Sequence, residues 1–180
     1  MKPFHFLKIT LCAFIAFLFV SCIQNKPYIS YKDTVQDMDI TQFLGTLYEV
    51  AQMGRPKKEQ VAQVLYKSYS DSKGSIQFTV EKKKYTIYGP VQIRKGMLRW
   101  NEDFPGVLRI SFYLNFYKDY YILYLADDYS VCLISNNTAS RLWILARSVD
   151  IKKEDFIAME EKITELGFDK SKIYWTEDIF

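Results

Sequence analysis

The chain has 180 residues, a formal net charge of +3 and 49% hydrophobic residues. That length fits one domain with a short tail. The charge is too small to favour a nucleic-acid partner, which requires a strongly basic surface. The only histidine is His5, so the rest of the chain lacks histidine-dependent nucleophile systems and the commonest metal ligand. We therefore expect no enzymatic activity, no metal site and no cofactor.

The N-terminus has the pattern of a secretory signal. Lys2 and Lys8 precede an unbroken apolar run over residues 9–20. This run is shorter than the roughly 20 residues that span a bilayer. Ser21-Cys22 follows and resembles the lipobox of bacterial lipoproteins, in which the cysteine becomes the lipidated N-terminus. We predict a signal peptide over residues 1–21 and acylation of Cys22, for example by palmitate; a secreted protein is the alternative. Cleavage removes two lysines and leaves 159 residues with a net charge of +1.

Residues 22–39 form a polar lead without a sustained hydrophobic period, and we expect them to serve as a tether. Beyond a short helical turn at residues 40–45, short apolar runs alternate with polar turns about every ten residues, which is typical of a β meander. The expected strands cover residues 46–53, 61–69, 75–82, 85–95, 107–113, 120–125, 129–134 and 141–146. Eight antiparallel neighbours predict an all-β, up-and-down barrel of a size that encloses one small ligand.

The last three of these runs are apolar on both faces. Such strands need apolar neighbours on each side, which a barrel provides with a cavity inside and a helix packed outside. The helix is expected to begin at an Asp150 N-cap and to end at Gly167. Its apolar stripe consists of Phe156, Met159, Ile163 and Leu166. A short ninth strand is expected over residues 171–175.

Period-two alternation assigns one set of side chains to the barrel interior. These cavity candidates are Leu47, Glu49, Ala51, Met53, Val64, Tyr66, Phe78, Val91, Ile110, Phe112, Tyr120, Ile122 and Tyr124. Aromatic residues make up 17% of the chain and form large, stiff walls, to which tyrosine adds a hydrogen-bonding hydroxyl. Glu49 is the one carboxylate in the set; it either anchors a ligand headgroup or is a structural partner for a tyrosine or an arginine. Cys132 is expected to be a small buried hydrophobe.

Three segments together resemble the lipocalins, and within them the bacterial outer-membrane lipoprotein subgroup, which is similar to apolipoprotein D. Residues 41–52, TQFLGTLYEVAQ, resemble the first motif of the family, and 127–129, DDY, the second. Residues 142–147, LWILAR, are similar to the third, and 167–175 to the tail of the subgroup. The resemblance implies a lipocalin domain over residues 40–180. It gives structural roles to Gly45, Asp128, Tyr129 and Arg147, with the arginine locking the barrel floor.

One position departs from the family pattern. Leu47 stands where lipocalins carry a tryptophan that plugs the closed end of the barrel under the arginine. A cation–π contact there contributes roughly 0.5–2 kcal/mol, and leucine cannot supply it. We predict a less tightly plugged floor or a compensating aromatic residue nearby.

The expected function is binding, storage or transport of a small amphiphilic lipid, a fatty acid or a lysophospholipid, in the barrel. The resemblance implies a lipid-anchored protein of the bacterial outer membrane that faces the periplasm, and Ile23 after the cysteine agrees with outer-membrane sorting. Two alternatives stay open: an interaction protein with a filled barrel, and an enzyme that modifies a lipid or pigment. A homodimer is also left open.

Overall fold

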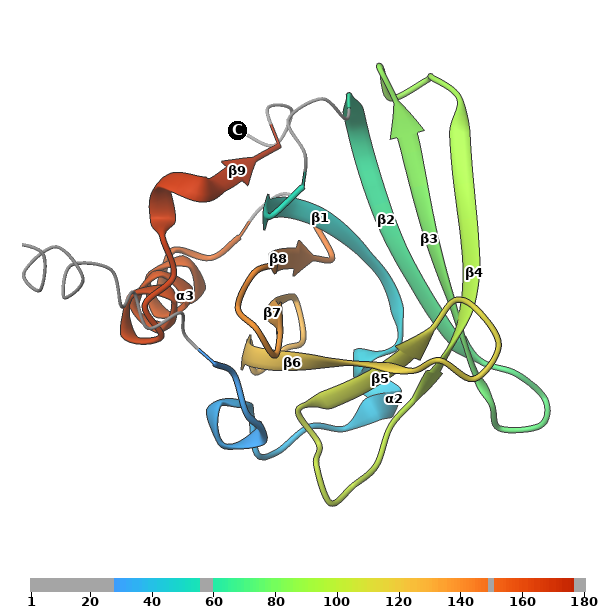
Figure 1. Ribbon diagram of the computed structural model, residues 1–180, viewed down its shortest axis with the longest axis horizontal. Coiled ribbons are helices and arrows are strands. Elements are labelled where there is room, and N and C mark those ends of the chain that lie inside the picture. Colours follow the sequence, from blue (N-terminus) through green and yellow to red (C-terminus); the bar gives the residue numbers. More distant parts are fainter. Residues whose placement is uncertain (1–27, 56–59, 149–150, 177–180) are drawn as a thin grey trace, which may run out of the picture.

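The computed structural model describes residues 28–55, 60–148 and 151–176. Eight antiparallel strands close into a barrel, because β1 pairs with both β8 and β2 (Figure 1). The strands are β1 Gly45–Met53, β2 Val61–Ser70, β3 Ile76–Lys84, β4 Val91–Arg99, β5 Val107–Ser111, β6 Lys118–Leu125, β7 Val131–Asn136 and β8 Leu142–Ala146. The predicted all-β barrel is confirmed.

Short helices and a ninth strand complete the fold. The 3-10 helix η2 (Tyr31–Asp33) and the helix α2 (Ile40–Phe43) precede the barrel. After it come α3 (Lys153–Glu165), η3 (Lys170–Lys172) and β9 (Ile173–Trp175), which pairs with the end of β1 outside the barrel. No helix in these described ranges is long and apolar enough to cross a membrane.

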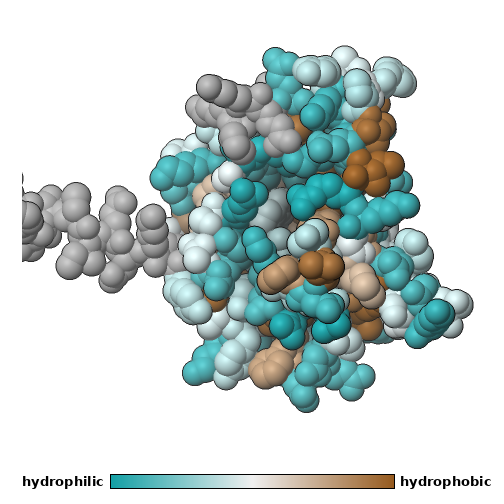
Figure 2. Space-filling view, turned by 45° about the vertical axis from the view of Figure 1, so that its right-hand side comes forward, coloured by the Kyte–Doolittle hydropathy of each residue, from teal (hydrophilic) through white to brown (hydrophobic). Residues whose placement is uncertain are grey.

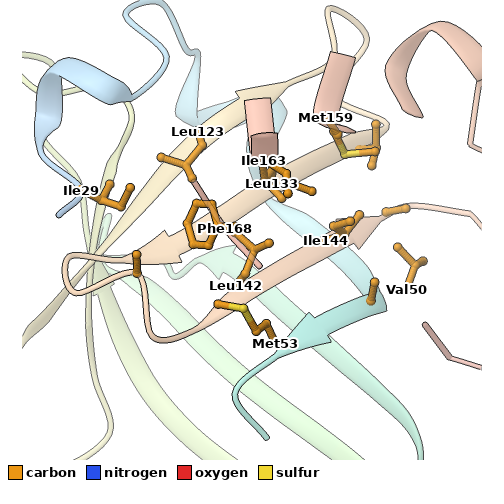
Figure 3. Close-up of a cluster of buried hydrophobic side chains, with 14 of the residues drawn as sticks. Ile29, Val50, Met53, Leu123, Leu133, Leu142, Ile144, Met159, Ile163 and Phe168 are labelled. Atoms are coloured by element: carbon orange, nitrogen blue, oxygen red, sulfur yellow. The ribbon is translucent and has the colours of Figure 1, made fainter. Parts of the chain in front are cut away.

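Apolar residues pack on both sides of β6, β7 and β8, as their sequences predict. One cluster lies between the outer face of the sheet and α3, where Met159 and Ile163 meet Leu133 and Ile144 (Figure 3). A second cluster lies inside the barrel and includes Ile122, Ile134 and Leu145. Five of the six residues of β7 are buried, since each face has a core of its own. The helix therefore covers the barrel without contributing to its interior.

The helix begins slightly later than the sequence suggests. Its N-cap is Lys152, whereas the expected cap, Asp150, lies outside the described residues. Gly167 follows the C-cap with φ +73°, a conformation that glycine adopts without strain, so the expected C-terminal position is confirmed. Tyr124 on β6 donates a hydrogen bond of 2.6 Å to Asp155 Oδ1 on α3. This bond fastens the helix to the barrel wall.

Several strand boundaries differ from the sequence prediction. Residues 85–90 form the β3–β4 turn, with Tyr85 at φ +68°, and β4 instead continues to Arg99. Gly96 therefore lies inside β4. Glycine is required at this position, because a Cβ would lie 2.3 Å from the carbonyl oxygen of Ser111. Similarly, Tyr129 belongs to the β6–β7 turn with φ +58°, and β7 begins at Val131.

The segment before the barrel packs against it. The backbone N–H of Ile29 donates to the carbonyl of Asn137 in the β7–β8 turn, and Val35 donates to the carbonyl of Ile122 in β6. Ile29 and Met38 are buried. The chain thus enters beside one end of the barrel and runs along its wall to the other end, where α2 lies (Figure 1). The described part of the expected tether is therefore part of the folded unit.

Candidate functional site: the barrel cavity

The end of the barrel that carries α2 is closed by Arg147. Its Nη2 donates to the backbone carbonyls of Gln42, Phe43 and Leu44 at 2.7, 3.1 and 3.2 Å, and its Nε donates to the carbonyl of Tyr129 at 2.9 Å. The guanidinium thereby satisfies the free carbonyls at the C-terminus of a very short helix. The arginine joins the entry segment, the β6–β7 turn and β8 at this end.

Phe43 lies at the floor of the cavity together with Leu47. Both side chains are about 5% exposed, belong to the inner cluster and line the cavity. Among the described residues, Arg147 makes no cation–π contact, and its donors go to carbonyls instead. An aromatic residue thus lies beside the position where the family has tryptophan, which was the second of the two expected outcomes.

Above this floor the barrel holds a cavity of about 340 Å³, within the range of small-molecule sites. Its wall is largely apolar and aromatic. The lining residues are Phe43, Leu47, Gln52, Met53, Arg55, Tyr66, Ser68, Phe78, Val80, Lys82, Arg94, Leu108, Ile110, Phe112, Tyr120, Ile134, Arg141, Trp143 and Leu145. Eight of the nineteen come from β2–β5, and the β1–β2, β3–β4, β5–β6 and β7–β8 connections surround the opposite, open end.

Seven of the thirteen sequence-predicted candidates line the cavity. These are Leu47, Met53, Tyr66, Phe78, Ile110, Phe112 and Tyr120. Val64 and Ile122 face the interior but belong to its packed part. Glu49 is 4% exposed and binds Tyr66, so it lies behind the lining.

The remaining three candidates were assigned to the wrong face. Ala51 packs in the outer cluster because a β-bulge between Glu49 and Ala51 shifts the alternation of β1. A second bulge, between Ile122 and Tyr124, has the same effect in β6 and turns Tyr124 toward α3. Val91 is 52% exposed, since it stands opposite Lys83 on the outer face of the β3–β4 hairpin.

Glu49 is held by Arg55 and Tyr66. Arg55 Nη2 forms an ion pair with Oε1 of the carboxylate, and the Tyr66 hydroxyl donates to Oε2 at 2.7 Å. Burial raises the pKa of Glu49, although Arg55 and Tyr66 partly oppose the shift. Burial, followed by the neighbouring carboxylate, raises the pKa of Tyr66 well above its ordinary value. Both carboxylate oxygens are engaged, which matches the structural alternative given for this residue.

Four cationic side chains line the upper part of the cavity: Arg55, Lys82, Arg94 and Arg141. No carboxylate is among the lining residues of the described chain. Arg94 lies over the ring of Phe112 with 4.4 Å from Cζ to the ring centroid. Arg94 and Arg141 both lie near the Tyr120 hydroxyl: burial raises the pKa of Tyr120, and these two cations oppose the rise. The cavity therefore has an apolar body and a cationic mouth.

Sequence reasoning missed the cationic mouth. Arg94 was placed in a strand whose bounds were wrong, and the correct pairing of Val80 with Arg94 puts both on one face. Lys82 continues the inward series of Phe78 and Val80, so strict alternation along β3 already contained this signal.

The described residues contain no group of three or more His, Cys, Asp or Glu side chains placed to hold a metal ion. Cys132 is 1% exposed, and burial raises the pKa of its thiol to about 12, which suppresses the reactive thiolate. This arrangement suits binding of a ligand by burial and charge.

Comparison with known proteins agrees with the architecture. A family model described as a lipocalin-like domain matches residues 38–178. Outer membrane lipoprotein Blc of Escherichia coli K12 is 26% identical over 185 residues, covering 95% of this chain and 96% of that protein. The Vibrio cholerae protein of the same name is 25% identical over 158 residues, covering 79% and 84%.

Solved structures share the fold at low sequence identity. The cockroach allergen Per a 4 superposes with a TM-score of 0.60 at 16% identity, covering 77% of this chain and 87% of that one. Lobster apocrustacyanin A1 superposes with a TM-score of 0.57 at 18% identity, covering 86% and 92%.

Proposed function

Since this chain belongs to the lipocalin-like family, whose model matches residues 38–178, we propose that it binds a small amphiphile in the barrel. The apolar tail lies in the body of the cavity, and an anionic headgroup lies at the mouth beside Arg94 and Arg141. A fatty acid or a lysophospholipid has this chemistry. The observation that carries the proposal is the combination of an apolar cavity of about 340 Å³ with cations, and no carboxylates, lining it in the described chain.

The body of the cavity supports the tail. Phe78, Leu108 and Ile110 line it, and each is less than 10% exposed. Each methylene moved from water into such a site contributes roughly 0.8 kcal/mol. The walls of the cavity belong to paired strands, so the site is largely formed before the ligand arrives.

The mouth supports an anionic headgroup. Arg55 is engaged with Glu49, whereas Arg94 and Arg141 form no ion pair with any described acid. Both lie close enough to Tyr120 for their charge to lower the pKa of its hydroxyl. An arginine guanidinium binds carboxylate or phosphate oxygens through two parallel donors. A carboxylate or phosphodiester at this point also gives the two cations a counter-charge.

The same reasoning favours a carrier over an enzyme. Glu49, the one acid close to the lining among the described residues, is occupied by Arg55 and Tyr66, and the buried Cys132 thiol is protonated. We infer that the protein stores or carries its ligand in the cell envelope, as a lipoprotein anchored through Cys22 in the outer membrane and facing the periplasm. Support comes from the Blc relatives, which are named outer membrane lipoproteins, and from the lipobox-like Ser21-Cys22.

Trp143 offers a direct test, because it is the one of the three tryptophans that lines the cavity. Titration with a fatty acid that carries bromine atoms along its tail is expected to quench Trp143 fluorescence and to saturate at one ligand per protein. In the Trp143→Phe variant the remaining tryptophans, Trp100 and Trp175, are expected to stay bright. Equal quenching of the variant, or no saturation, contradicts a tail in the cavity.

The headgroup is tested with paired ligands and paired variants. An Arg94→Gln, Arg141→Gln double variant is expected to bind the brominated acid roughly tenfold or more weakly, the loss of two charge-assisted contacts. Its affinity for the uncharged glycerol ester of the same acid is expected to stay within about twofold. Arg99→Gln is a control, because Arg99 lies outside the cavity lining over the Tyr117 ring. A double variant that loses both ligands equally contradicts the charge assignment.

A further inference from the structure

We propose that the open end of the barrel docks onto the surface of an anionic lipid bilayer. The exposed side chains of the β3–β4 hairpin and the β5–β6 loop enter the headgroup region, and the surrounding cations contact the lipid phosphates. This inference goes beyond ligand binding, since the exposed hairpin and loop side chains that enter the headgroup region lie outside the cavity lining. Three features of the molecule carry it.

The first feature is a charge difference between the two ends of the barrel. At the open end, residues 54–55, 60, 82–92, 112–118 and 137–141 contain six lysines and arginines and no acid. At the closed end, residues 36–44, 71–75, 100–106, 126–130 and 147 contain seven acids and two cations. Clusters of lysine and arginine are attracted to anionic headgroups, and acids are repelled by them. The charges therefore orient the open end toward an anionic membrane.

The second feature is a concentration of exposed apolar side chains at the same end. Seven of the fifteen large hydrophobic side chains that are exposed in the described chain lie within residues 85–91 and 113–116. Tyr88, Leu114 and Phe116 are 91%, 73% and 70% exposed. Figure 2, which brings the right-hand side of Figure 1 forward, shows brown hydrophobic atoms among teal hydrophilic ones on this face. Aromatic residues mixed with lysine and arginine are the composition of interfacial membrane anchors.

Two of these exposed side chains belong to residues with a strained backbone conformation. Tyr85 and Leu114 have φ of +68° and +47°, a left-handed conformation that costs a bulky residue energy and that glycine or asparagine adopts more readily. Both side chains are more than two-thirds exposed, so burial within the protein does not offset the strain. Strained residues of this kind concentrate at functional sites. Here the strain places an aromatic and an aliphatic group at two loop tips of the open end.

The third feature is the place where the described chain begins. Ile29 is hydrogen-bonded to Asn137 in the β7–β8 turn, which belongs to the open end. Ile29 is seven positions beyond Cys22, and a fully extended chain of that length reaches at most about 25 Å. This step rests on the lipidation proposed above, while the charge and the exposed side chains do not. A lipid on Cys22 holds the open end, rather than the acidic closed end, close to the bilayer.

Docking in this orientation places the cavity mouth against the lipid surface. An amphiphile can then pass between the bilayer and the barrel without exposing its whole tail to water. A second copy of the chain is the other partner that an apolar face can accept. The net positive charge of the face opposes pairing with an identical surface, whereas it favours an anionic bilayer.

Sedimentation with vesicles tests the proposal without the anchor. The chain from residue 22 with Cys22→Ser keeps every described residue, so the whole barrel is present. It is expected to bind vesicles of phosphatidylglycerol and phosphatidylcholine at least tenfold more tightly than vesicles of phosphatidylcholine alone. Raising the salt from about 50 to about 300 mM is expected to remove most of this difference, because salt screens charges at the surface.

A double variant, Tyr85→Asn with Leu114→Asn, separates docking from stability. Asparagine suits the left-handed backbone, so the midpoint of urea unfolding is expected to stay equal or to rise. Vesicle binding is expected to fall about tenfold, a loss of about 1.4 kcal/mol. Tyr69→Asn is the matched control, because Tyr69 is 57% exposed but lies at the closed end of β2, and it is expected to bind within about twofold of the parent.

Three results overturn the proposal. The first is equal binding to neutral and anionic vesicles, and the second is equal loss in the double variant and in Tyr69→Asn. The third is a dimer in sedimentation velocity that becomes monomeric in the double variant, because it assigns the face to a second copy. Quenching of Trp143 by the brominated acid is measured without vesicles, so a failure of docking leaves the test of the cavity intact.

Discussion

Gly45 and Arg147 form a steric and electrostatic unit at the barrel floor, and Gly45→Ala tests it. Gly45 has φ +124°, and a Cβ there would lie 2.9 Å from Arg147 Nη1. A long side chain can usually move away from such a contact. Arg147 cannot move freely, because its guanidinium donates to the carbonyls of residues 42, 43 and 44 and to that of Tyr129.

The expected cost of Gly45→Ala has two parts. The backbone conformation, which is nearly exclusive to glycine, costs an alanine about 1–3 kcal/mol. Displacing the guanidinium weakens charge-assisted hydrogen bonds worth about 1.5–3 kcal/mol each. The three carbonyls of residues 42–44 share one nitrogen, so we count them as a single bond. The sum is a loss of about 2.5–6 kcal/mol in the free energy of unfolding, measured by urea titration.

Gly74→Ala is the matched control. Gly74 also has a positive φ, +77°, but no atom lies within 4 Å of the position of its Cβ. Its substitution is expected to cost about 1 kcal/mol, the backbone part alone. In an Arg147→Met background, Gly45→Ala is expected to lose about 1.5–3 kcal/mol of its effect, since the clash is gone. A coupling energy below about 0.5 kcal/mol in this cycle refutes the reasoning.

Three further predictions concern buried groups. Tyr124→Phe is expected to lower the free energy of unfolding in urea by about 1–3 kcal/mol, because it removes the hydrogen bond to Asp155 Oδ1, and Asp155 Oδ2 has no partner. Tyr121→Phe, which removes no such bond, is expected to cost less than about 0.5 kcal/mol. Equal costs would contradict the role of Tyr124 in fastening α3 to the barrel. Because folding raises the pKa of Glu49, the difference in unfolding free energy between the parent and Glu49→Gln is expected to be greatest below about pH 4.3, the pKa of an unfolded glutamate, and to fall as the pH rises through the folded pKa. A difference that grows between about pH 4 and pH 7 would show that the charge of Arg55 outweighs burial. In the Cys22→Ser chain, the Cys132 thiol is expected to react with a thiol reagent at pH 8 only as fast as the protein unfolds, and rapid labelling of the native protein would contradict its burial.

The parts of the fold that depend on regular patterns were predictable from the sequence. Strand count, strand order and the outer helix followed from turn residues and from the two apolar faces of the later strands. The motif residues Gly45 and Arg147 were also identified, and the structure supplies their physical role: glycine leaves room for a guanidinium that caps α2. Local sequence and tertiary contacts agree at these positions.

The errors lie where one extra residue or one close contact breaks a pattern. Ala51 and Tyr124 each follow a β-bulge, and a bulge shifts the inward and outward alternation at that point without changing the composition of the strand. The expected fourth strand ended at residue 95, just before Gly96, whereas this glycine lies inside β4 and is required by the approach of the Ser111 backbone from the neighbouring strand. The cationic mouth was missed because Arg94 and Arg141 are far apart in the sequence and line one cavity only once the barrel is closed. These features depend on contacts between strands rather than on sequence within one strand.

The central claim is that the cavity holds one amphiphile. Native mass spectrometry of the Cys22→Ser chain, purified from bacteria without detergent, tests it most directly. The account predicts a one-to-one complex whose extra mass is a lipid of the host, displaced by an added lysophospholipid and absent from a variant in which Ile110→Trp fills the cavity. An unliganded mass that acquires no lysophospholipid or fatty acid on titration would contradict it and would favour a filled barrel that acts through its surface.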